Sequence, residues 1–369
     1  MRRLVLGFGC ILVLLVPLLA CSRRERPRRT RPIASGPAAI VPAQPQLPDE
    51  LPADLGEMKI PADNQQSDAK IALGHQLFFD TRLSVDGSRA CYSCHQNDHG
   101  NGGEEPIATG ALEKKLTRHS PVIWNVGYLP ALYWDGRAAS LEEQARGAWA
   151  GDNMGVGEDK LQQKADELAK LPAYQKAFAA AFPGAKVTPD IIVKALASYE
   201  RTLVCNDTAY DRFAKGDRKA LTKTQQRGLA LFLSPDTGCT SCHAPPFFSV
   251  AYGTPAGAYF NVGIGTKKPH NEVDVGRQAV TKKEEDWAAF KPPSLRNAAK
   301  SAPYFHDGSA ATLADAVRTM AGGGIPNPQL SPLVGDRKLT AAQINDIVTF
   351  LGALDCGKLE EPSSGSPAH

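Results

Sequence analysis

Two short cysteine motifs constrain this chain of 369 residues more than any other feature. The first reads Cys91-Tyr-Ser-Cys94-His95 and the second reads Cys239-Thr-Ser-Cys242-His243. The spacing Cys-x-x-Cys-His is the attachment signal for c-type haem, in which two thiols bond one haem and the adjacent histidine ligates its iron. A zinc site would need paired motifs that close one tetrahedron, and a redox-active dithiol does not need the histidine. The sequence therefore predicts two covalently bound haems.

The first 21 residues resemble an export signal. Two arginines precede an apolar run from Leu4 to Leu19, and the run ends in Leu-Leu-Ala-Cys at Cys21. That ending resembles a bacterial lipobox, whose cysteine becomes lipidated; a simple signal peptide or an uncleaved anchor is the alternative. We expect residues 1–21 to be a lipoprotein signal peptide, with Cys21 anchoring the protein on the periplasmic side of a bacterial membrane. The sequence does not indicate whether this membrane is the inner or the outer one.

Composition sets limits on the rest of the chain. Hydrophobic residues make up 42% and charged residues 22%, which is ordinary for a globular protein. The net charge of +3 includes arginines crowded between Arg23 and Arg31, and a basic linker alone does not indicate nucleic-acid binding. Residues 22–60 are rich in Pro, Arg and Ala without an apolar period, so we expect a flexible linker there. A disordered tail is expected over 358–369.

The chain contains an internal duplication. Pro121–Asn125 precedes Trp134-Asp-Gly with the same spacing as Pro293–Asn297 precedes His306-Asp-Gly, and a Gly-x-x-Leu-Phe pattern precedes each cysteine motif. Each half thus contains a helix, a haem motif, a long loop, an Asp-Gly turn and a second helix. We expect a mainly α fold with two cytochrome c-like lobes, each holding one covalent c-type haem, joined by long loops. The expected lobes span residues 61–220 and 221–357.

Two further cysteines, Cys205 and Cys356, belong to neither motif. Cys205 follows a helix whose start is indicated by Thr188-Pro189, and Cys356 follows a helix whose capping box begins at Thr340. Leftover cysteines often pair in an oxidising compartment, and two buried thiols are the alternative.

From about Pro61 to Leu354 the chain resembles the bacterial di-haem cytochrome c peroxidases and their MauG-like relatives. The matching stretches are the two haem motifs, Leu77–Ser84, Tyr133–Ala138, Ser140–Glu142, Leu295–Asn297 and Ala302–Gly308. The resemblance implies a peroxidatic haem in the first lobe and an electron-transfer haem in the second. It implies reduction of hydrogen peroxide to water, with electrons from a small cytochrome c or cupredoxin.

The resemblance assigns roles to single residues. His95 and His243 match the proximal ligands, and Met320 matches the methionine on the second iron, where a thioether raises the haem potential. A core methionine is the alternative for Met320. Trp134 matches a tryptophan that lies between the haems and relays electrons or packs the interface. His306 is its counterpart in the second repeat, and we expect it to hydrogen-bond a haem or to order its turn rather than to ligate iron. Gln144 matches a glutamine near the peroxide pocket.

Some positions depart from the family. Ala111 stands at the position of a histidine that caps the peroxidatic iron in many family members. Because alanine cannot ligate iron, that iron should be open to peroxide. His99 or His119 could replace this histidine ligand only if a loop moved. His119 stands where the peroxidases have an asparagine that helps to bind calcium. Imidazole is a poor ligand for a hard cation, and this argues against a calcium ion between the haems, which the resemblance would otherwise imply.

The slot of the family's distal glutamate falls on Asn153 or Met154, neither of which is an acid. Losing a general acid commonly costs about 10²–10⁴ in rate. The nearby acids that could replace it are Asp152, Glu143 and Glu158.

Two other functions stay open. The first is MauG-like oxidation of a Trp or Tyr of a partner protein, which the open haem and the missing glutamate permit. The second is a non-catalytic di-haem electron carrier or sensor, which would not turn over peroxide. The electron donor and the formation of a homodimer are also open.

Overall fold

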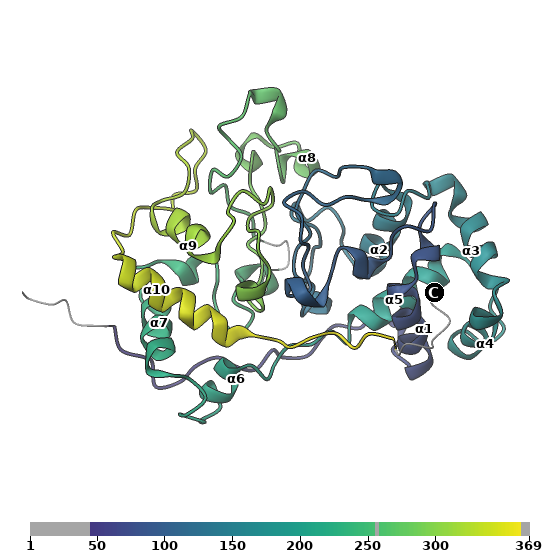
Figure 1. Ribbon diagram of the computed structural model, residues 1–369, viewed down its shortest axis with the longest axis horizontal. Helices are drawn as coiled ribbons and strands as arrows, with labels where there is room; N and C mark the ends of the chain where they lie inside the picture. Colours follow the sequence, from purple (N-terminus) through teal and green to yellow (C-terminus); the bar gives the residue numbers. More distant parts are fainter. Residues whose placement is uncertain (1–44, 255–257, 363–369) are drawn as a thin grey trace, which may run out of the picture. The chain divides into compact units, whose positions relative to one another are not determined.

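The computed structural model describes residues 45–254 and 258–362. The predicted signal peptide, Cys21 and most of the predicted linker lie outside these ranges. The described chain consists of α-helices, short 3-10 turns and long loops, and its β-pairing is limited to isolated bridges (Figure 1). This confirms the mainly α fold. No helix in the described part is long and apolar enough to cross a membrane.

The first lobe is built from five helices. They are α1 (Asp68–Phe79), α2 (Leu141–Ala150), α3 (Leu161–Ala169), α4 (Pro172–Ala181) and α5 (Pro189–Glu200). Helix α5 begins as predicted: the Thr188 side chain accepts a hydrogen bond from the amide of Ile191, and Pro189 occupies the first turn. Helix α5 packs against α1 and α2, and its apolar face is the centre of the first core.

The second lobe also has five helices. They are α6 (Ala209–Ala214), α7 (Lys223–Leu233), α8 (Gln278–Thr281), α9 (Leu313–Ala321) and α10 (Ala341–Leu351). Capping boxes start α7 and α10, the latter between Thr340 and Gln343 as predicted. Helix α10 packs against α7 and α9 (Figure 1). Because Tyr210 and Phe213 of α6 already belong to the second core, that core begins before residue 221.

One glycine in each lobe lets two helices cross closely. A Cβ atom at Gly74 of α1 would overlap the carbonyl oxygen of Ala195 in α5. A Cβ atom at Gly228 of α7 would overlap the carbonyl oxygen of Asp346 in α10. These glycines begin the repeated Gly-x-x-Leu-Phe pattern, so the pattern encodes the same helix crossing in both lobes.

The internal duplication extends to the backbone. Asn125 and Asn297 both adopt φ of 63° and open equivalent turns. The side-chain oxygen of Asn125 accepts a hydrogen bond from the amide of Cys205 at 2.8 Å, and that of Asn297 accepts one from the amide of Cys356 at 2.8 Å. The two leftover cysteines are thus held at equivalent places, each after the last long helix of its repeat.

Cys205 and Cys356 form a disulfide. It spans 151 positions of sequence and joins the segment between the lobes to the segment that follows α10. Of the alternatives left open by the sequence, the structure therefore shows pairing. The bond links the equivalent ends of the two repeats.

Removing this disulfide should destabilise the protein markedly. A native cross-link that closes so long a loop typically contributes about 2–5 kcal/mol, chiefly by restricting the unfolded chain. We expect the double variant Cys205→Ser/Cys356→Ser to unfold at lower denaturant concentration by that amount. Dithiothreitol should lower the wild-type midpoint in the same way and leave the double variant unchanged, because thioethers resist thiols. Equal midpoints for wild type and double variant would contradict this.

Both expected flexible ends are packed where the structure describes them. Leu47 and Leu51 pack against the second core, and the carbonyl of Pro52 accepts a hydrogen bond from Tyr210 at 2.7 Å. After α10 the chain runs back to the first lobe (Figure 1), where Leu359 is buried in the first core and Asn97 bonds its backbone. Residues 45–60 and 358–362 therefore differ from the flexible linker and disordered tail that the sequence suggested.

Candidate haem sites

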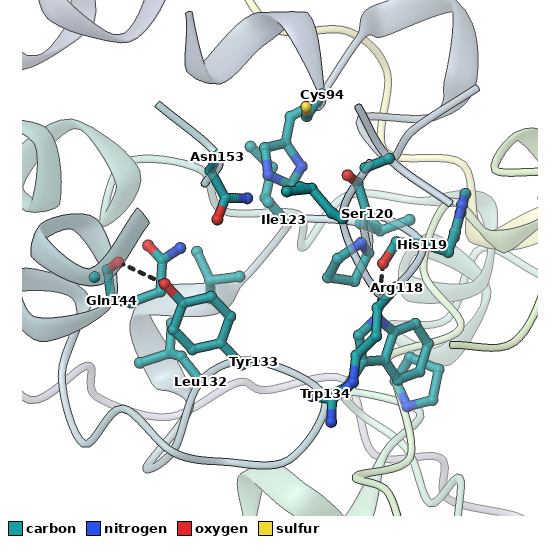
Figure 2. Close-up of a pocket in the computed structure, with 18 of the residues that line it drawn as sticks. Cys94, Arg118, His119, Ser120, Ile123, Leu132, Tyr133, Trp134, Gln144 and Asn153 are labelled. Carbon is teal, nitrogen blue, oxygen red and sulfur yellow. Dashed lines mark hydrogen bonds between the residues drawn. The ribbon is translucent and has the colours of Figure 1, made fainter. Parts of the chain in front are cut away.

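The first haem motif opens onto a cavity of about 480 Å³ in the first lobe. Cys94 and His95 form part of its wall, and the loop 114–123, the turn 132–134 and helix α2 form much of the rest. Figure 2 shows Cys94 and Trp134 on opposite sides of this cavity, with Tyr133, Gln144 and Asn153 along it.

His95 has the chemical state that an iron ligand needs. Burial lowers the pKa of its imidazole to about 4, so the ring is neutral at pH 7. Its Nδ1 atom is buried without a hydrogen-bond partner among the described residues. Cys94 lies on the same cavity wall as this neutral imidazole, and Cys91 stands three residues before Cys94; both thiols are free, which fits a covalently held haem.

The second motif opens onto a cavity of about 250 Å³ in the second lobe. Cys239, Cys242 and His243 line it, together with Met320 from α9. The Nδ1 atom of His243 lies 3.1 Å from the carbonyl oxygen of Phe248, which fixes the ring and leaves Nε2 for a metal. Burial lowers the pKa of His243, so this ring too is neutral. His243 and Met320 in one cavity fit the predicted pair of iron ligands.

The two cavities share a wall that contains Trp134 and His119. The indole Nε1 of Trp134 donates to the carbonyl oxygen of His119 at 2.8 Å (Figure 2), and the amide of His119 donates to the carbonyl of His306 at 2.7 Å. His306 lines the second cavity and stacks on Phe290, with ring centroids 3.7 Å apart. Trp134 and His306, the counterparts in the two repeats, have ring centroids 6.4 Å apart. Aromatic rings therefore connect the cavities.

An ion-pair network joins the lobes beside this wall. Arg118 is 14% exposed and contacts Asp135 of the first lobe at 2.7 Å and Asp274 of the second at 2.6 Å. His119 directs its Nδ1 to the carbonyl of Glu105 at 2.8 Å. Among the described residues, no cluster of three or more His, Cys, Asp or Glu side chains could hold a metal ion.

Comparison with known proteins decides the family. A family model described as di-haem cytochrome c peroxidase matches residues 68–219. The chain is 36% identical over 330 residues to the cytochrome-c peroxidase IdrP1 of Pseudomonas sp. (strain SCT), covering 82% of this chain and 85% of that one. It is 31% identical over 317 residues to the methylamine utilization protein MauG of Methylophilus methylotrophus, covering 85% and 88%. This chain belongs to the di-haem cytochrome c peroxidase and MauG family.

A solved structure agrees with this membership. The crystal structure of a MauG-like protein associated with microbial copper homeostasis matches with a TM-score of 0.74 and 28% identity, over 84% of this chain and 94% of that one. As a member of this di-haem peroxidase family, the chain is an oxidoreductase, and the family implies haem cofactors. The two-lobed cytochrome c-like fold predicted from the motifs is confirmed.

Of the two residues expected at the distal slot, the structure brings one to the first cavity. Asn153 lines the first cavity, and its side chain points into it (Figure 2). Met154 is 5% exposed and packs in the first core instead. Gln144 also lines the cavity, and its backbone carbonyl oxygen accepts a hydrogen bond from the hydroxyl of Tyr133 at 2.9 Å. Ala111 is buried outside the described lining of the cavity.

Of the acids suggested as replacements, the structure brings one to the cavity. Asp152 lines it, with a side chain 66% exposed that lies 4.0 Å from Lys114. Glu143 caps the start of α2 through the amide of Ala139, and Glu158 pairs with Arg146, so both are engaged elsewhere.

Sequence reasoning missed one acid, Glu200, at the end of α5. It lines the first cavity, and its Oε2 atom is buried without a hydrogen-bond partner among the described residues. Burial raises the pKa of Glu200 to about 8, although the nearby Arg201 opposes the shift. This carboxyl group therefore holds its proton at neutral pH.

Proposed function

We propose that this protein reduces hydrogen peroxide to water at the first cavity, with electrons that enter at the second. One peroxide O–O bond breaks, two electrons and two protons are taken up, and two waters form. A small cytochrome c or cupredoxin would deliver the electrons one at a time. Covalently bound haem would supply the redox chemistry, and the chain would bind, orient and connect the two groups.

The difference between the two cavities is the observation that carries this proposal. Met320 and His243 both line the second cavity, which fits an iron that would be saturated by protein ligands. In the described lining of the first cavity, the one other histidine is His119, whose Nδ1 is engaged by the carbonyl of Glu105. The first iron would thus keep a position for peroxide, and the second would pass electrons.

The remaining residues suit these two tasks. The amides of Gln144 and Asn153 border the first cavity and can donate hydrogen bonds to peroxide. Trp134 lies in the wall between the cavities, where an indole ring shortens the electron path. His306 continues that path next to Trp134. Burial lowers the pKa of His306 to about 4, so its ring is neutral.

The direct test is steady-state turnover of the purified di-haem protein. Reduced cytochrome c is mixed with hydrogen peroxide and the holoprotein, and oxidation of the cytochrome is followed optically. The proposal expects two cytochromes oxidised per peroxide, at a rate proportional to the holoprotein. Absence of peroxide-dependent oxidation with both cytochrome and cupredoxin donors would overturn it.

Replacing Met320 should affect the second haem alone. A thioether opposite histidine raises haem potential, so Met320→Leu is expected to lower the midpoint potential of one haem and remove its sulfur-to-iron absorption band. Met154→Leu is the matched control, because this methionine packs in the first core and the swap conserves volume. Two haems with unchanged potentials in Met320→Leu would show that another group caps the second iron.

A MauG-like function is favoured by one observation, the amide of Asn153 in place of an acid at the distal slot. Slow proton delivery would prolong an oxidised state of the haem pair and allow a Trp or Tyr of a partner protein to be oxidised. Stopped-flow mixing with peroxide in the absence of donor separates the two functions. Rapid decay followed by donor-dependent turnover supports peroxide reduction, and a state that persists until a partner protein is added supports the alternative.

We also propose that Cys21 anchors the protein by lipid on the periplasmic side of a bacterial membrane, because the sequence before it resembles a lipobox. Cys21→Ser should move the protein from the membrane fraction to the soluble fraction after cell breakage, as judged by immunoblotting. Cys10→Ser, within the same signal, should leave it in the membrane fraction. A soluble wild-type protein would contradict the anchor.

A further inference from the structure

A buried lysine stands in the wall between the two cavities. Lys291 lines both of them and is 8% exposed. Its amide donates a hydrogen bond to the carbonyl of Trp134 at 2.9 Å, which fixes it beside the aromatic connection. Its ammonium group donates to the carbonyl of Ala131 at 2.8 Å. The peroxide reaction proposed above assigns no task to this charge.

The ammonium group of Lys291 lacks a carboxylate partner among the described residues. Within residues 45–254 and 258–362, no salt bridge within 4.0 Å joins it to an acid. The acid that acts on its pKa is Asp135, whose carboxylate oxygens are already held by Arg118 at 2.7 Å and Arg137 at 3.0 Å. Burial lowers the pKa of Lys291 to about 7, and Asp135 offsets this in part. A buried ammonium with one partner is costly, and a nearby carboxylate would relieve that cost.

A c-type haem brings such carboxylates to this place. Its two thioethers lie along one edge of the macrocycle, and its two propionates extend from the opposite edge. Cys94 and Trp134 lie on opposite sides of the first cavity (Figure 2), and Lys291 is bonded to the backbone of Trp134. A haem tethered at Cys94 would therefore direct its propionate edge toward the wall that contains Trp134 and Lys291.

We propose that Lys291 is the cationic partner of haem propionates at the wall between the two cavities. The ammonium group donates its remaining N–H bonds to propionate oxygens and places a positive charge between the haems. A fixed positive charge favours the reduced state of a nearby haem. Lys291 is therefore a binding and positioning residue that also supports electron flow between the lobes. The inference requires haem in both cavities and holds for either of the proposed reactions.

The test compares Lys291→Met, Lys291→Gln and Lys291→Arg with the wild-type holoprotein. Resonance Raman spectroscopy follows the propionate bending bands, and spectroelectrochemistry follows the midpoint potential of each haem. Lys291→Met should shift a propionate band and lower the equilibrium constant for reduction of at least one haem about tenfold. Lys291→Arg should restore both signals. A change confined to one haem also supports the proposal and identifies which haem contributes the propionate.

Two comparisons keep the test decisive. Lys338→Met removes an exposed lysine paired with Asp336 and should leave both signals unchanged. Lys291→Gln keeps a donor for the Ala131 carbonyl without the charge, so it also decides the matter if the Met variant fails to mature with two haems. Propionate bands and potentials in the Gln variant that equal those of the wild type would overturn the proposal, because Lys291 would then serve only the backbone.

Discussion

Asn153→Glu is expected to raise the rate of peroxide reduction by about 10²–10⁴-fold, the range that a positioned general acid commonly contributes. Asn153 borders the first cavity and directs its amide into it, and an amide cannot give up a proton to a departing oxygen. A glutamate at this position would supply that proton and would leave the other residues that line the cavity unchanged. The measurement is kcat/KM for peroxide with saturating reduced cytochrome.

Two controls make this expectation specific. Asn153→Gln lengthens the side chain in the same way but adds no acid, so its rate should stay near that of the wild type. Asp152→Asn removes the exposed neighbouring acid and tests whether it contributes. If Asn153→Glu is no faster than Asn153→Gln, the proton reaches peroxide by another route, and protonated Glu200 in the wall becomes the group to replace.

Arg296→Met should destabilise the protein by about 3–5 kcal/mol, the usual cost of leaving one member of a buried ion pair without its partner. The side chains of Arg296 and Asp211 are both fully buried and lie 2.8 Å apart. Arg296 also donates to the carbonyl of Pro246 at 2.8 Å, so it joins α6 to the loop after the second haem motif. Denaturant unfolding of the holoprotein measures the loss.

The pair also predicts a pH effect. Burial alone would raise the pKa of Asp211, but Arg296 holds that pKa below its ordinary value of 3.8. A group whose folded pKa is depressed contributes stability above its unfolded pKa, and that contribution disappears as the pH falls through the folded value. The wild type should therefore lose stability below about pH 3.8 more steeply than Asp211→Asn.

Matched variants separate the missing partner from general disruption. Arg296→Met/Asp211→Leu removes both charges and should recover much of the loss, since apolar replacements of buried pairs are often neutral. Arg318→Met breaks an exposed pair with Asp315 and should cost less than about 1 kcal/mol. A double variant no more stable than Arg296→Met would show that the cost came from packing.

Repetition made the architecture predictable from the sequence. The glycines, the cysteine motifs and the Asp-Gly turns recur in the same order in both halves, and each recurrence corresponds to the same physical element. Gly74 and Gly228 permit the same helix crossing, and Asn125 and Asn297 hold the same turn. Even the leftover cysteines occupy equivalent places, although the sequence could not show that the two places lie side by side.

Single residues within the repeat were harder to predict. Asn153 and Met154 were indistinguishable as distal residues because one turn after α2 decides which of them faces the cavity. Arg296 replaces the apolar Trp124 of the first repeat, and its partner Asp211 lies far away in sequence. Glu200 and Lys291 are ionisable residues at buried places, and a linear pattern does not distinguish buried ionisable residues from exposed ones. An isolated charge inside an apolar run, as at Phe290-Lys291-Pro292-Pro293, was the one signal available.

The proposed function requires that the two haem irons implied by the family have unequal surroundings. The electron paramagnetic resonance spectrum of the oxidised holoprotein, recorded together with its optical spectrum, tests them directly. One high-spin ferric haem and one low-spin haem with histidine and methionine ligands are expected in equal amounts. Two low-spin haems saturated by protein ligands in every redox state, or one haem per chain, would contradict it.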